Sequence, residues 1–172
     1  SINSGQKKFF NFIEKKAPVS QSEGFIKYNC SYEAKVENSS RKFYISIEVP
    51  IATLCPCSKA ISEYGAHNQR GRVKVKLLYT DFFWIEDIIS LIEECSSTPL
   101  YSVLKRKDEK YVTERAYENP KFVEDVLRDV ICLLEEDEKV TFYEVEVEAQ
   151  ESIHNHNAWA WQSENKIIGD KK

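Results

Sequence analysis

All three histidines of this chain lie in two short polar segments, residues 54–69 and 151–158. The first segment holds Cys55, Cys57 and His67, and the second holds Glu151, His154 and His156. Thiolate, imidazole and carboxylate groups are the mixed sulfur, nitrogen and oxygen donors that suit zinc or a related divalent ion. A site with few protein ligands leaves room for a water molecule, whose pKa a metal lowers to about 7. The pattern therefore predicts a metal site that performs hydrolysis.

The spacing of the two histidines in the second segment allows them to have different roles. On an extended backbone, His154 and His156 project to the same side, about 7 Å apart, so that one can bind metal while the other moves protons. Glu151 has the opposite parity and needs a bulge or an irregular turn to join them. Asn155 and Asn157 favour such a turn.

Other interpretations of these residues stay open. The tight Cys55-Pro56-Cys57 spacing also suits a redox or nucleophilic thiolate, although this would leave the histidines unexplained. A structural zinc clip in an interaction domain is a non-enzymatic alternative, and it predicts unfolding on chelation. The remaining cysteines are predicted to be small buried hydrophobic residues. They are Cys30, Cys95 and Cys132.

Composition narrows the range of partners. The formal net charge is −4, from 28 acidic and 24 basic side chains, which argues against nucleic acid or an anionic membrane as a partner. An anionic substrate must therefore meet a local cationic pocket. There is no apolar run of about 18 residues, and Ser1–Lys8 lacks the apolar stretch of a secretory signal. With five irregularly spaced cysteines, we expect a cytoplasmic protein in a reducing compartment.

Period-two patterns predict the strands that position these segments. Lys27–Val36 and Lys42–Val49 are rich in β-branched and aromatic residues and flank a turn at Glu37–Ser40, which predicts an antiparallel hairpin. Arg72–Leu78 alternates basic and apolar residues, as a half-buried strand does. Thr141–Ala149 alternates in the same way and leads directly into the second polar segment.

Helical spacing predicts two helices. Asp81 is expected to cap the first; Asn119 as N-cap and Pro120 at the first helical position are expected to begin the second. The charged stretch Lys105–Thr113 is predicted to be a connecting loop that presents functional side chains. The order predicts an α+β fold with a mainly antiparallel sheet and helices on one face. The apolar stripes are Phe82, Ile85, Ile88, Ile89 and Ile92, then Val123, Val126, Leu127, Val130, Ile131 and Leu134.

The two polar segments resemble the signatures of type IB GTP cyclohydrolases. The similarity runs through most of the chain from about Ala17 onward. It is carried by Leu54-Cys-Pro-Cys-Ser-Lys59, Tyr64-Gly-Ala-His-Asn-Gln-Arg70, Lys105-Arg-Lys-Asp-Glu-Lys110, Val112-Thr-Glu-Arg-Ala-Tyr-Glu-Asn-Pro120 and Glu151-Ser-Ile-His-Asn-His-Asn-Ala158. The resemblance implies conversion of GTP and water to 7,8-dihydroneopterin 3′-triphosphate and formate, the first step of tetrahydrofolate biosynthesis.

The resemblance also implies residue roles. A divalent ion, Zn²⁺ or Mn²⁺ with Fe²⁺ as a further candidate, is expected on Cys55, His67, Glu109 and His154; Glu114 and Glu124 are alternatives to Glu109. Catalytic roles fall to Cys55, Cys57 and His156, the last as general acid and base. Glu151 is expected to hold the guanine edge, because a carboxylate accepts two parallel hydrogen bonds. Lys59 and Arg70, with Arg72 as a further candidate, are expected to meet the triphosphate.

The family fold implied is the tunnelling fold, in which antiparallel sheets with two antiparallel helices on one face close into barrels by oligomerisation. We expect a homo-oligomer, a tetramer, with active sites between subunits. Residues 1–16 are expected to be a lead-in or a remnant of a preceding module, 17–162 the catalytic module, and 163–172 a tail. The nitrile reductase of queuosine biosynthesis is a related alternative; it uses a nucleophilic cysteine and a nicotinamide cofactor.

Overall fold

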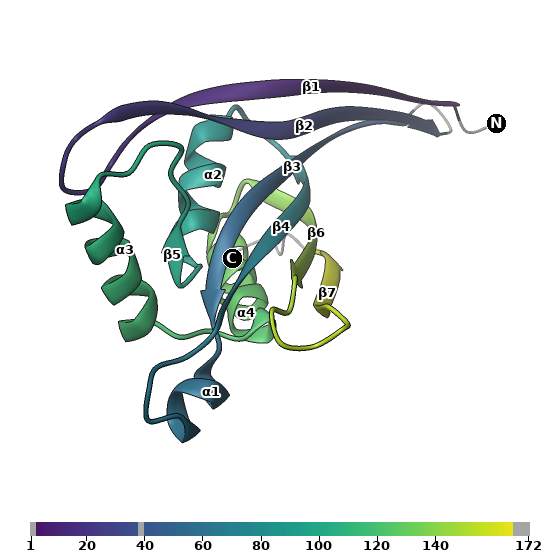
Figure 1. The fold of residues 1–172 in the computed structure, drawn as a ribbon. Helices are drawn as coiled ribbons and strands as arrows, with labels where there is room; N and C mark the ends of the chain where they lie inside the picture. Colours follow the sequence, from purple (N-terminus) through teal and green to yellow (C-terminus); the bar gives the residue numbers. More distant parts are fainter. Residues whose placement is uncertain (1–2, 38–39, 167–172) are drawn as a thin grey trace.

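The computed structural model describes residues 3–37 and 40–166, which form an antiparallel sheet with helices packed on one face (Figure 1). The strand order is β1-β2-β3-β4-β6-β7, and the short β5 pairs with β3. The predicted α+β class and antiparallel sheet are confirmed. The strands are β1 Asn3–Lys16, β2 Glu23–Glu37, β3 Ser40–Leu54, β4 Asn68–Tyr79, β5 Thr98–Pro99, β6 Val140–Ala149 and β7 Ala158–Asn165, and the helices are α1 Pro56–Ile61, α2 Ile85–Glu94, α3 Arg106–Glu118 and α4 Val123–Glu136.

The core lies between the sheet and helices α2 and α4. The alternation predicted for three strands is confirmed, because the odd-numbered positions of β3, β4 and β6 are buried against the two helical stripes. Each fully buried aliphatic side chain stabilises the fold by about 1.5–3 kcal/mol. Cys30 and Cys95 are buried as predicted, but the prediction for Cys132 is wrong, because this residue lies off the apolar stripe of α4 and is exposed.

Both predicted helix starts are wrong. The first helix, α2, begins at Ile85 after Trp84, while Asp81 accepts a hydrogen bond from the Phe82 N–H. Asn119 is the C-cap of α3 and not the N-cap of α4, which begins only at Val123. The Asn119 side chain has a tertiary partner instead, because its amide donates to the Ser96 carbonyl at 2.9 Å.

The stretch Lys105–Thr113 is helical from Arg106 onward, so the predicted loop is wrong. Lysine, arginine and glutamate are good helix formers, and a polar sequence can form a largely exposed helix. Asp108 fixes the first turn, because its carboxylate accepts the N–H groups of Lys105, Val19 and Ser20. Burial alone would raise the pKa of Asp108, but these hydrogen bonds outweigh it and hold the pKa well below its usual range.

The predicted hairpin is confirmed in β2 and β3, although part of its turn lies outside the described residues. The strand before it, β1, was not predicted and pairs with β2 from Asn3 to Lys16. The expected boundary after residue 16 therefore coincides with the end of β1, and the boundary after residue 162 falls inside β7. No helix in residues 3–37 and 40–166 is long and apolar enough to cross a membrane.

Candidate active site

Cys55 lies where the sheet ends and helix α1 begins. Its N–H donates to the His67 carbonyl at 3.1 Å, which extends the β3–β4 ladder by one pair, and its sulfur accepts from the Ser58 N–H at 3.5 Å. The Ser58 hydroxyl donates to the Cys55 carbonyl at 3.1 Å and accepts the His67 N–H at 3.3 Å. Cys55 and His67 are therefore held on adjacent backbone segments, while the Cys57 thiol lies exposed on α1.

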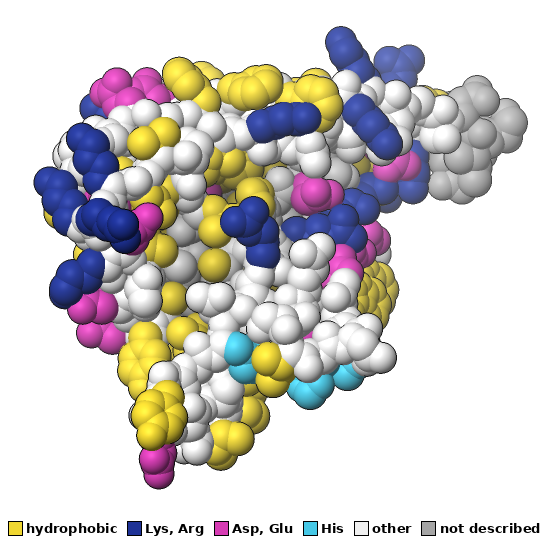
Figure 2. Space-filling model, in the orientation of Figure 1, with side chains coloured by type: hydrophobic (Ala, Val, Ile, Leu, Met, Phe, Trp, Pro, Cys, Tyr) yellow, Lys and Arg dark blue, Asp and Glu magenta, His cyan; other side chains and the backbone are white. Residues whose placement is uncertain are grey.

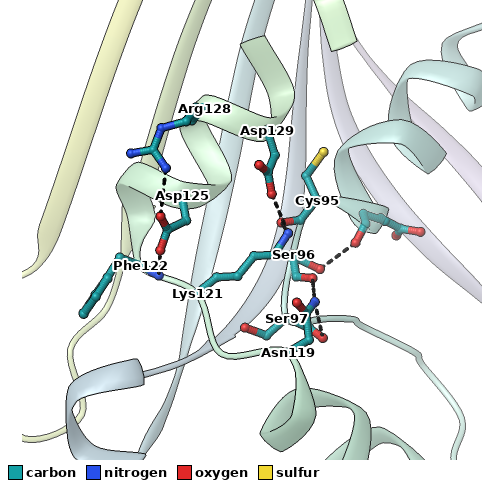
Figure 3. Close-up of polar contacts among 10 residues, drawn as sticks. Cys95, Ser96, Ser97, Asn119, Lys121, Phe122, Asp125, Arg128 and Asp129 are labelled. Atoms are coloured by element: carbon teal, nitrogen blue, oxygen red, sulfur yellow. Dashed lines mark hydrogen bonds and ion pairs between the residues drawn. The ribbon is translucent and has the colours of Figure 1, made fainter. Parts of the chain in front are cut away.

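A network of polar contacts behind the sheet holds the end of β3 in place. The Leu54 N–H donates to the buried Ser97 hydroxyl at 3.1 Å, and the Leu54 carbonyl accepts the Lys121 N–H at 3.1 Å. Figure 3 shows how the segment between α3 and α4 reaches this point: the Asn119 amide points at the carbonyls after α2, and the Lys121 ammonium bridges the Cys95 carbonyl and Asp129. These contacts fix the strand that delivers Cys55.

Gly65 permits the return of the chain from α1 to His67. Its φ of 120° lies in a region that residues with a Cβ rarely adopt, and a Cβ there would meet nothing within 4 Å. The glycine is needed for its backbone conformation and not for space. It allows residues 62–67 to reverse direction and enter β4 beside Cys55.

The segment after β6 meets the first segment directly. The Ser152 hydroxyl lies 3.2 Å from Nδ1 of His67, and the Gln69 amide donates to Glu151 Oε1 at 2.9 Å. The contact at Nδ1 leaves Nε2 of His67 as the nitrogen available to a metal. Figure 2 shows histidine side chains gathered along one edge of the molecule, at the end from which α1 projects in Figure 1.

The loop that carries the other two histidines is bent from Ser152 to His156, as the parity of Glu151 required. The rings of His154 and His156 stack with centroids 5.3 Å apart, although the backbone between them is bent and not extended as the prediction assumed. Both are exposed. At the far end of the loop, the Asn157 amide donates to Glu148 at 2.8 Å and, together with Arg72, lowers the pKa of that carboxyl.

The donor types suit a zinc-like ion, but the described part of the chain does not gather them completely. No group of three or more His, Cys, Asp or Glu side chains in residues 3–37 and 40–166 is placed to hold a metal. Cys55 and His67 are joined by a backbone hydrogen bond, and His154 follows Ser152 by two residues. Glu109 lies on α3, about half exposed, with Arg106 3.8 Å away. The donor types suit a metal, but the described residues do not bring a complete set of ligands together.

The cations expected to meet the triphosphate are placed differently from one another. Lys59 Nζ donates to the Tyr117 carbonyl at 2.5 Å and lies over the Tyr117 ring. Arg70 is exposed beside the site and has no charged partner within the described residues. Arg72 donates to Glu148 at 2.9 Å and lies within 4 Å of Glu48 and Glu146, so its charge is already compensated.

A cleft that sequence reasoning missed lies between α3 and the ends of β3 and β4. Its volume is about 260 Å³, and Thr53, Gln69 and Thr98 contribute the buried polar side chains of its wall. Thr53 Oγ and Gln69 Oε1 have no hydrogen-bond partner among residues 3–37 and 40–166. Only the register of the sheet, which places Thr53 opposite Gln69, could have indicated this pair.

A sequence model of the type I GTP cyclohydrolase FolE2 family matches residues 4–160. The GTP cyclohydrolase FolE2 of Thermosipho africanus is 54% identical over 149 residues, covering 87% of this chain and 58% of that protein. The FolE2 of Fervidobacterium nodosum is 54% identical over 156 residues, covering 91% and 60%. The chain therefore spans less than two thirds of the length of these relatives. Among solved structures, uricase from Arthrobacter globiformis matches with a TM-score of 0.50 at 9% identity, covering 98% of this chain and 65% of that one, which is a likeness of fold alone.

Proposed function

We propose, since this chain belongs to the type I GTP cyclohydrolase FolE2 family, that it carries active-site residues of a type IB enzyme converting GTP and water to 7,8-dihydroneopterin 3′-triphosphate and formate. The observation that carries the proposal is the contact between His67 and Ser152, because it joins the two segments that hold every histidine of the chain. Gln69 and Glu151 make a second link between the same segments.

Glu151 is the residue proposed to hold the base. Its carboxylate accepts the N1–H and the exocyclic amine of guanine, a pairing that a carboxylate makes in a bidentate manner. Arg70 and Lys59 bind the triphosphate. Arg70 is the more readily available of the two, because the Lys59 ammonium already donates to the Tyr117 carbonyl. This local cationic pair meets the requirement that the negative net charge of the chain imposes on an anionic substrate.

His156 is the proposed general acid and base. It donates a proton to N7 of the purine as water adds to C8, after which the five-membered ring opens and C8 leaves as formate. Its ring stacks on that of His154, so the proposed general acid and base lies next to a proposed metal ligand. Cys57, which is exposed on α1 two residues after Cys55, is assigned an assisting role at the same site.

The metal assignment is part of this proposal. Cys55, His67, Glu109 and His154 would hold Zn²⁺ or Mn²⁺, with Fe²⁺ as a further candidate, and the ion would supply a water molecule of lowered pKa. The serine contact at Nδ1 of His67 supports this role, since metal-bound histidines usually engage their second nitrogen in this way. Among these four side chains, Glu109 would have to move furthest to bind the ion, because it is exposed on α3.

Assembly into a barrel is proposed to complete the site. Within the described residues β1 and β7 end the sheet, and each presents unpaired backbone groups. Both edges also carry exposed aromatic side chains on the face away from the helices: Phe10 and Phe12 on β1, Trp159 and Trp161 on β7. Such side chains suit contacts between modules. We propose a tunnelling-fold homo-oligomer, a tetramer, with active sites between subunits.

Separating the two histidines tests the proposed roles. In the full-length protein, His154→Ala should lose both bound metal and formate release, whereas His156→Ala should retain the metal and lose formate release. Metal content is measured by elemental analysis and formate by a coupled enzyme assay. The assignment is wrong if His156→Ala loses the metal or if His154→Ala retains full turnover.

A further inference from the structure

The cleft beneath α3 contains two polar groups without a partner in the described part of the chain. Thr53 is 1% exposed and Gln69 is 9% exposed, yet neither Thr53 Oγ nor Gln69 Oε1 makes a hydrogen bond to a described residue. An unpaired buried polar group destabilises a folded protein, so folded proteins rarely keep two of them side by side without a use. Both line the same cleft.

The sheet register places this pair next to Glu151. Thr53 is opposite Gln69 in the β3–β4 ladder, and Gly71 is opposite Ala149 in the β4–β6 ladder. The Gln150 N–H donates to the Arg70 carbonyl at 2.8 Å, which continues the second ladder by one residue. Glu151, Gln69 and Thr53 therefore form a row across three strand ends, on the face that α3 covers.

The chemistry of the Gln69 amide fixes its orientation. An ionised carboxylate can only accept hydrogen bonds, so the nitrogen of the amide must face Glu151 and the oxygen must face elsewhere. The observed contact runs from Gln69 Nε2 to Glu151 Oε1 at 2.9 Å, and Gln69 Oε1 is left in the cleft. Gln69 Oε1 is thus an acceptor next to the Glu151 carboxylate in this row, without a donor among residues 3–37 and 40–166.

The wall opposite this row comes from α3. Val112, Thr113 and Ala116 line the cleft, and Glu109 lies one turn before them. The cleft therefore adjoins the helix that carries the least secure proposed metal ligand. A ligand held here would lie between Gln69, which contacts the base-binding carboxylate, and that helix.

We propose that Gln69 determines specificity for guanine, by orienting the Glu151 carboxylate and by accepting a proton of the exocyclic amine on its own Oε1. This inference rests on the proposed function, since it concerns the base of the same substrate. Guanine suits the arrangement because its amine has two protons. Glu151 takes one of them together with N1–H, and Gln69 takes the other.

Binding measurements on full-length protein freed of metal by a chelator test this role without turnover. Calorimetry compares GTP with ITP, whose base lacks the exocyclic amine. The wild-type protein should bind GTP at least about tenfold more tightly than ITP, which is the value of one good hydrogen bond. Gln69→Met keeps the length of the side chain and removes its polar atoms. This variant should prefer GTP over ITP by about tenfold less than the wild-type protein does, because only the contact between Glu151 and the amine remains. It should also bind ITP more weakly than the wild-type protein does.

Thr98→Val is the matched control, because Thr98 lines the same cleft and is buried, but its hydroxyl already has a local partner in the Pro99 carbonyl. It should keep the wild-type preference for GTP. An unchanged ratio of GTP to ITP affinity in folded Gln69→Met overturns the inference, as does loss of the preference in Thr98→Val.

Nucleotide analogues keep the test valid if Gln69→Met does not fold. N²-methyl-GTP has one amine proton fewer and should bind wild-type protein at least about tenfold more weakly than GTP; equal binding overturns the inference. Formate release reports separately on the proposed function. Tighter binding of GTP than of its analogues, without formate release, would refute the proposed reaction and support recognition of the amine by Gln69. Formate release with equal binding of GTP and its analogues would support the reaction and refute the recognition by Gln69.

Discussion

Replacing Ser97 with alanine should loosen the strand that delivers Cys55. Ser97 is completely buried and its hydroxyl accepts the Leu54 N–H at 3.1 Å. Because Cys55 and His67 form the hydrogen-bonded pair of the ladder, the Leu54 N–H points away from β4 and has no alternative partner there. Leu54 is only 4% exposed, so water cannot readily replace the hydroxyl.

The expected cost of Ser97→Ala is that of one unpaired buried donor, about 1–3 kcal/mol. For a chain of this size, about 2 kcal/mol lowers Tm by about 4–8 °C. Affinity for Zn²⁺ or Mn²⁺ should fall by about 10–100-fold, as it does when groups that orient metal ligands are removed. Urea unfolding followed by circular dichroism measures the first effect, and competition with a chelator measures the second.

Ser96→Ala is the control for this change. Ser96 is equally buried, but its hydroxyl donates to the Glu93 carbonyl, which the Ser96 N–H also reaches at 3.2 Å. Removing the hydroxyl leaves no group unpaired, so the cost should stay below about 1 kcal/mol. Equal stability and equal metal affinity of the two variants would refute the idea that Ser97 holds the end of β3.

Three further predictions concern the sheet, the core and acid stability. Gly71→Ala should destabilise the protein, because a Cβ there would lie 2.6 Å from the Glu148 carbonyl, whereas Gly5→Ala, with nothing within 4 Å, should be nearly neutral in thermal melts. Leu134→Ala should cost about 2–5 kcal/mol in urea unfolding and the half-exposed neighbour Leu133→Ala less than about 1 kcal/mol; equal costs would contradict the assigned core. Because its pKa is lowered in the folded state, ionised Asp108 stabilises the fold above the unfolded pKa of about 3.9, and this stabilisation is lost as the pH falls below that value. The decrease in Tm caused by Asp108→Asn should therefore be larger at pH 7 than at pH 3. A deficit independent of pH would show that the charge of Asp108 contributes nothing.

The sequence predicted the parts of the fold that repeat regularly. Alternation in 72–78 and 141–149 identified two central strands, and the stripe from Val123 to Leu134 identified the buried face of α4. The predicted helix boundaries were wrong because they rested on the capping preferences of single residues, which tertiary contacts can override. Asn119 looks like an N-cap in sequence, but its amide is used to bind the Ser96 carbonyl across the fold.

The charged helix α3 could not be found from hydrophobic periodicity, because little of it is buried. Its position depends on Asp108, whose partners Val19 and Ser20 lie in the turn between β1 and β2. The two polar segments of the site were identified from residue types and spacing. The contact between His67 and Ser152 and the cleft beside Gln69 depend on strand register across the sheet, which local patterns do not encode.

The most direct test of the central claim is formate release from GTP by the full-length protein, before and after removal of metal. The claim predicts formate in a one-to-one ratio with the GTP consumed, together with pterin fluorescence. A chelator should abolish both, Mn²⁺ or Zn²⁺ should restore them, and the circular dichroism spectrum should not change. Absence of formate with every ion would contradict the claim, and unfolding on chelation would instead indicate a structural zinc clip.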